Sequence, residues 1–154
     1  MDFTLDDAGH SESAAISPRD GGSLALRSYQ QSQVLTASRE QLVVLTYDGI
    51  LRFLGRACRG LETGDYYEKH LGLARAQALI IDLARSLDRT ASPELAGNLF
   101  AIYARWLDEL VTADADDDQP RIAAVMALVA DLREAWAEVA RRAATDSLAL
   151  RLGP

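Results

Sequence analysis

Three aspartates at alternate positions, Asp114, Asp116 and Asp118, have the spacing of the first three ligands of a calcium-binding loop. Such a loop also needs a glycine at its sharp turn and, at its end, a glutamate that binds calcium through both oxygens. Those two positions hold Gln119 and Val125 here. The sequence therefore favours a solvated acidic linker over a calcium site.

Neither histidine has the neighbours that metal or nucleophile chemistry requires. A di-iron site in a helical bundle needs a glutamate three residues before each ligating histidine, but Tyr67 precedes His70 and Asp7 precedes His10 at that spacing. A serine or cysteine nucleophile would need a base beside it, and no glycine-rich phosphate loop is present. We therefore predict no catalytic residues, no metal site and no cofactor, so the chain is not expected to be an enzyme.

The composition argues against several further classes of protein. The chain has 154 residues, enough for one domain, and its formal net charge of −7 argues against nucleic-acid binding. The acidic first residues do not resemble a secretory signal, and no apolar run approaches the roughly 20 residues that cross a bilayer. The single cysteine, Cys58, excludes an intramolecular disulfide. We expect a cytosolic protein that neither binds nucleic acid nor inserts into a membrane.

Helical start signals divide the chain into segments. Ser38 and Gln41 have the pattern of a capping box, and Asp65 with Glu68 repeats it in acidic form. A proline opens each of the last two segments. Apolar residues at spacings of three and four follow every start. We predict helices over about 38–62, 65–87, 93–113 and 119–142.

Four long helices with short connectors predict an all-α fold, an antiparallel up-down four-helix bundle within residues 29–143. Residues 1–28, rich in Asp, Ser and Gly, predict a disordered N-terminal tail. Residues 29–37 form a short apolar arm before the first helix. Residues 144–154 are expected to be a disordered C-terminal tail.

The first predicted helix has more apolar positions than one buried face requires, so either every side is packed or one side binds something else. Gly49 within it would let a neighbouring helix come close, and Asp48 must face water or accept hydrogen bonds. The two main apolar rows are Val43, Tyr47, Ile50, Leu54, Ala57 and Leu61, and beside them Leu42, Leu45, Gly49 and Phe53.

Short motifs follow one another along the predicted arm and bundle. In order they are Tyr29-Gln30-Gln31, Val34-Leu35-Thr36-Ala37-Ser38, Leu42, Tyr47-Asp48-Gly49-Ile50, Gly64-Asp65, Ala74-x-Ala76-Gln77, Leu87-Asp88, Asn98-Leu99-Phe100-x-x-Tyr103 and Leu132-Arg133-x-Ala135-Trp136. This series resembles the FliS family of flagellin-export chaperones. The chain departs from the family in Arg39, where a proline is usual, and in its longer N-terminal tail.

The resemblance implies a cytosolic chaperone that holds the disordered C-terminal segment of flagellin before secretion and prevents premature polymerisation. Such a segment can become helical in an apolar groove between bundle helices. The resemblance leaves open contacts with components of the flagellar export apparatus. Candidate flagellin-binding residues are Leu42, Leu45, Asp48, Gly49, Phe53, Ile80, Phe100, Tyr103 and Leu107.

The apolar arm, with Tyr29, Val34 and Leu35, is the candidate cover of that groove. We expect flagellin to displace it; the arm as ordinary capping structure is the alternative. A different class of function also remains open. The same apolar faces could form a homodimer, which would make the chain a helical-bundle adaptor without a chaperone client.

Overall fold

The computed structural model describes residues 24, 27, 28, 31 and 37–154. The chain divides into two units, Met1–Thr36 and Ala37–Pro154. The arm residues Tyr29, Val34 and Leu35 and most of the predicted N-terminal tail lie outside the described residues. The fold below is that of the second unit.

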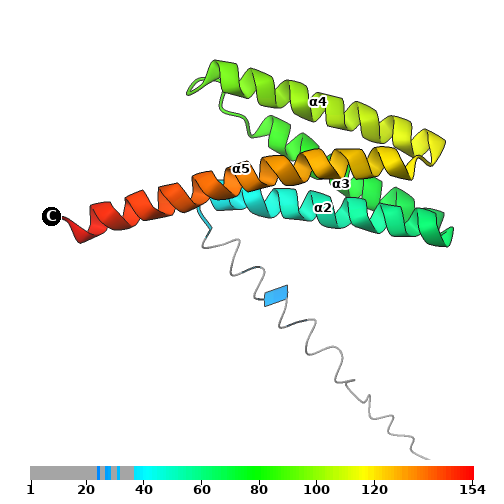
Figure 1. The fold of residues 1–154 in the computed structure, drawn as a ribbon, viewed down its shortest axis with the longest axis horizontal. Coiled ribbons are helices and arrows are strands. Elements are labelled where there is room, and N and C mark those ends of the chain that lie inside the picture. The colour runs from blue at the N-terminus through cyan, green and yellow to red at the C-terminus, as the bar shows by residue number, and fades with distance from the viewer. Residues whose placement is uncertain (1–23, 25–26, 29–30, 32–36) are drawn as a thin grey trace, which may run out of the picture. The chain divides into compact units, whose positions relative to one another are not determined.

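The second unit consists of four helices: α2 (Arg39–Thr63), α3 (Tyr66–Arg85), α4 (Pro93–Asp116) and α5 (Gln119–Leu152). Each helix runs antiparallel to the one before it, and α5 returns beside α2 (Figure 1). Residues 37–154 contain no strand. The predicted all-α antiparallel bundle is thereby confirmed.

Side-chain caps form at three helix starts, and the sequence predicted two of them, Ser38 and Asp65. The Ser38 side chain accepts a hydrogen bond from the backbone N–H of Gln41, whose side chain accepts one from the Ser38 N–H. Asp65 accepts from the backbone N–H of Glu68, and Asp118 caps α5 in the same way. These bonds satisfy N–H groups that have no partner within the first helical turn.

The core lies along the bundle axis and takes residues from all four helices. At its centre the hydroxyl groups of Tyr47 and Tyr103 lie 2.5 Å apart. Trp106 packs edge-on against Tyr47 with ring centroids 6.3 Å apart. The largest fully buried side chains are Tyr47, Tyr103, Ile50, Leu54, Leu73, Ile80, Leu110, Ile122, Val125 and Val129.

Helices α2 and α3 touch backbone to backbone through glycines. A Cβ atom on Gly72 would lie 2.6 Å from the carbonyl oxygen of Phe53 and 2.8 Å from the nitrogen of Ala57. A Cβ atom on Gly60 would lie 2.6 Å from the nitrogen of Lys69. No side chain fits at either position without moving the backbone.

The predicted acidic linker is shorter than expected. Helix α4 continues to Asp116, and only Asp117 and Asp118 separate it from α5. Asp117 has a left-handed backbone with φ 49°. The buried ammonium of Lys69 lies 2.5 Å from the Asp117 carboxylate and donates to the backbone carbonyl of Asp114. This cation holds the acidic turn against α3, so the turn is not simply solvated.

The C-terminal residues also differ from the prediction. We expected a disordered tail over 144–154, but α5 continues to Leu152. Residues 144–152 include three leucines and two alanines, which are strong helix formers, and no Gly or Pro occurs before Gly153. The end of the apolar pattern did not predict the end of α5, because a helix can extend past its packing partners.

Candidate functional site

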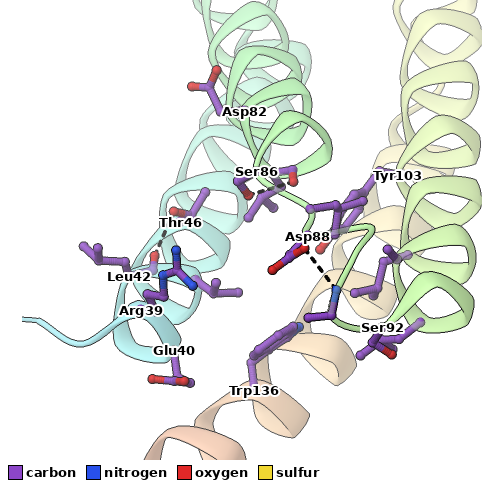
Figure 2. A pocket seen from close by; sticks show the side chains of 17 residues that line it. Arg39, Glu40, Leu42, Thr46, Asp82, Ser86, Asp88, Ser92, Tyr103 and Trp136 are labelled. Atoms are coloured by element: carbon purple, nitrogen blue, oxygen red, sulfur yellow. Dashed lines mark hydrogen bonds between the residues drawn. The ribbon is translucent and has the colours of Figure 1, made fainter.

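A cavity of about 560 Å³ opens at the end of the bundle where α2 and α4 begin (Figure 2). The first turns of α2 and α4, the end of α3 and Trp136 of α5 surround it. Most of its wall is apolar. The apolar lining residues are Leu42, Val43, Leu83, Leu87, Ala91, Leu95, Ala96, Leu99, Tyr103 and Trp136.

The inner wall of this cavity includes Tyr103, whose hydroxyl group shares a hydrogen bond with Tyr47. Burial, followed by this hydrogen bond, raises the pKa of Tyr47 far above its usual range. Burial likewise raises the pKa of Tyr103. Both phenols therefore stay neutral, and the wall presents an aromatic surface without charge.

The connector between α3 and α4 forms one side of the cavity mouth and is shaped by Asp88 (Figure 2). Its carboxylate accepts hydrogen bonds from the Thr90 hydroxyl at 2.6 Å and from the backbone N–H groups of Thr90 and Ala91 at 2.9 and 3.2 Å. These bonds hold the pKa of Asp88 below its usual range. They fix the turn that places Ala91 on the cavity wall.

A second cavity, of about 320 Å³, lies between α4 and α5. Its lining consists of Ile102, Arg105, Trp106, Leu128, Asp131 and Leu132. Leu132 lies one helical turn before Trp136 on α5, and Ile102 lies three residues after Leu99 on α4. The smaller cavity therefore lies close to the part of the larger one that Leu99 and Trp136 line.

The structure brings only two of the predicted flagellin-binding residues to the larger cavity, Leu42 and Tyr103. Ile80 is fully buried, and Gly49 is buried against Leu79. Asp48 pairs with Arg133 on α5.

The remaining predicted residues lie elsewhere on the bundle. Phe53 and Leu107 are half-buried and pack against the core, and Leu45 is half-buried on α2. Phe100 is exposed beneath the guanidinium of Arg89, whose carbon lies 5.0 Å from the ring centroid.

Leu95, Leu99 and Trp136 line the larger cavity, although none of them was among the candidate binding residues. Leu95 is 51% exposed because it lies in the first turn of α4, close to the cavity mouth. The sequence could have indicated this exposure only through the position of Leu95. An apolar residue in the first turn of a helix has fewer neighbours than one in the middle.

The described part of the chain contains no group of three or more His, Cys, Asp or Glu side chains that could hold a metal ion. Among the described helices, none is sufficiently long and apolar to span a membrane.

Comparison with known proteins identifies related sequences over most of the chain. The family described as flagellar protein FliS matches residues 22–143. The flagellar secretion chaperone FliS of Campylobacter jejuni is 33% identical over 75% of this chain and 91% of its own length. Its counterparts in Bacillus subtilis and Escherichia coli are 34% and 33% identical, each over 70% of this chain and 80% of their own length.

These matches confirm the resemblance found in the motifs, and with it the prediction that the chain is not an enzyme. They cover α2, α3, α4 and most of α5. The chain belongs to the FliS family.

Proposed function

We propose that this protein is a flagellar export chaperone that acts in the cytosol and binds the disordered C-terminal segment of flagellin. The observation that carries the proposal is the open apolar cavity at the end of the bundle, formed by all four helices. Its volume is within the range of sites that bury a ligand. The relatives named above as flagellar secretion chaperones support the same role.

The binding mode follows from the shape and polarity of the cavity. An amphipathic segment that becomes helical on binding would place apolar side chains against Leu95, Leu99 and Trp136. Its polar face would meet the mouth, where Arg39 and Asp82 are found. Covering the apolar face of flagellin in this way prevents its premature polymerisation.

The arm residues Tyr29, Val34 and Leu35 remain our candidate cover of this cavity. They directly precede α2 in the sequence, and Arg39 at the start of α2 is part of the cavity lining. In this proposal the arm and flagellin compete for the same apolar surface, and flagellin displaces the arm.

Isothermal titration with the last forty or so residues of a cognate flagellin tests the proposal. Leu95→Asp places a charge in the cavity at a position already half exposed, so the fold is preserved, and we expect affinity to fall about tenfold or more. Val111→Asp is the matched control, because Val111 is exposed on the same helix and does not line the cavity.

Circular dichroism checks that both variants keep their helical content. Unchanged affinity in Leu95→Asp would refute this cavity as the site. The homodimeric adaptor would replace the chaperone if two results were found together. The peptide would bind neither the monomer nor the dimer of this protein, and light scattering would show a dimer that Leu95→Asp dissociates.

A further inference from the structure

Helices α4 and α5 carry a partly apolar surface around the smaller cavity, of about 320 Å³. The two helices are consecutive in the chain and run antiparallel (Figure 1). Ile102 on α4 is 38% exposed, and Leu128 on α5 is 52% exposed. Trp106 and Leu132, which are more deeply buried, complete the apolar lining. Large apolar side chains that surround a hollow and stay in contact with water indicate a surface that can bind a partner.

One positive and one negative side chain also line this cavity, Arg105 on α4 and Asp131 on α5, and both residues are exposed. Elsewhere these two helices pair their charges, as Arg121 on α5 does with Glu109 on α4. Within the part of the chain that the structure describes, neither Arg105 nor Asp131 makes an ion pair or a hydrogen bond through its side chain. The surface therefore offers one unpaired charge of each sign beside exposed apolar groups.

We propose that this surface, lined by the residues of the smaller cavity, binds the same surface of a second copy of the chain. In a two-fold symmetric dimer both copies use one patch, which must be complementary to itself. Consider a two-fold axis in the plane of the surface that crosses the line from Arg105 to Asp131 at its midpoint and at right angles. This axis places each Arg105 against Asp131 of the second copy. The dimer then gains two ion pairs and covers Ile102 and Leu128.

Charge complementarity favours a second copy over other occupants. A surface with one free cation and one free anion selects neither an acidic nor a basic ligand, but it matches itself in a symmetric pair. Each chain has a net charge of −7, so two copies repel one another at long range. We therefore expect a dimer of moderate affinity, with a dissociation constant on the order of 10 μM.

This inference does not depend on the proposed function. Among the described residues, none lines both cavities, so the dimer uses a surface other than the proposed flagellin site. It also differs from the homodimeric adaptor, whose association depends on the larger cavity. The dimer proposed here should therefore persist in Leu95→Asp, because Leu95 does not line the smaller cavity.

Sedimentation equilibrium of the full chain tests the proposal. At about 100 μM we expect a species with twice the 16.8 kDa mass of one chain, which dissociates on dilution. Arg105→Glu and Asp131→Arg each place like charges opposite one another twice, so each should weaken association about tenfold or more. Asp146→Arg is the matched control, because it makes the same change of charge at an exposed position of α5 that does not line the cavity.

An equimolar mixture of Arg105→Glu and Asp131→Arg tests the pairing itself. In a mixed dimer the introduced glutamate of one chain faces the introduced arginine of the other. Asp131 of the first chain then faces Arg105 of the second. We therefore expect the mixture to associate about as tightly as the wild type, although neither variant does so alone.

Three results would overturn the proposal. The first is a wild-type chain that stays monomeric at about 100 μM. The second is a dimer that the two charge variants leave intact, or one that their mixture fails to restore. The third is an Arg105→Glu protein with unchanged association and a lower affinity for the flagellin peptide, which would assign the smaller cavity to the client.

Discussion

The carboxylate of Asp48 on α2 accepts two hydrogen bonds from the guanidinium of Arg133 on α5, at 2.8 and 3.4 Å. The pair explains how an aspartate is tolerated in a helix that is otherwise apolar on several sides. The Asp48 hydrogen bonds, followed by the contact with Glu134, raise the pKa of Arg133 above its usual range.

Asp48→Ala should destabilise the bundle without abolishing flagellin binding. Both side chains are about one third exposed, so water screens the pair, and we expect a loss of about 1 kcal/mol in the free energy of unfolding. Urea denaturation measures it, and Arg133→Met completes a double-mutant cycle. A large loss of affinity with unchanged stability would instead return Asp48 to the binding site.

Gly72→Ala should be strongly destabilising, because the new Cβ atom would meet backbone atoms of α2 at 2.6 and 2.8 Å. We expect a cost of about 2 kcal/mol or more, seen as a lower thermal midpoint. Gly97→Ala is the control, since a Cβ atom there meets nothing within 4 Å and should stabilise α4 by up to about 1 kcal/mol. Similar effects of the two substitutions would contradict the close contact of α2 and α3.

Lys69→Met should loosen the turn between α4 and α5. Lys69 is 3% exposed, and its removal leaves the carboxylates of Asp114 and Asp117 without their cation. Because those carboxylates are partly exposed, we expect about 2 kcal/mol of destabilisation by urea denaturation. Lys69→Arg tests whether charge alone suffices in the buried position. A Lys69→Met protein as stable as the wild type would show that the turn needs no cation.

The Asp88 turn should be sensitive to acid. The Thr90 hydroxyl, followed by the two backbone N–H groups, lowers the pKa of Asp88 in the folded state. The stability that it adds is therefore present above its unfolded pKa, about 3.9, and is lost as the pH falls through the lower folded value. We expect the amide NMR signal of Ala91 to titrate with a midpoint below 3.9, and the signal to stay constant in Asp88→Asn. A midpoint at or above 3.9 would argue against these bonds.

Deletion of residues 1–35 should raise the affinity for the flagellin peptide and increase the fluorescence of a dye that binds apolar surfaces. The reason is that the deletion removes Tyr29, Val34 and Leu35, the proposed competitor for the cavity. Deletion of residues 1–21 alone keeps the arm and is the control. If the longer deletion changes neither affinity nor dye binding, the arm has no covering role.

Helix starts were predictable from the sequence because capping is local: Ser38 and Gln41 meet within one turn. The end of α5 was not, because its last turns rest on helix propensity and have no buried seam. The candidate site was predicted least well. Whether Leu95 or Trp136 is covered depends on where neighbouring helices end, which no spacing along one helix reveals.

The glycine contacts between α2 and α3 determine which part of the cavity can yield to a guest. Gly60 and Gly72 let the two backbones meet without intervening side chains, so these helices cannot slide or separate without losing that contact. Leu42 and Leu83 therefore belong to a rigid side of the cavity, and Leu95 and Leu99 to the opposite side. We therefore expect that any widening of the cavity comes from a shift of α4 and not from separation of α2 and α3.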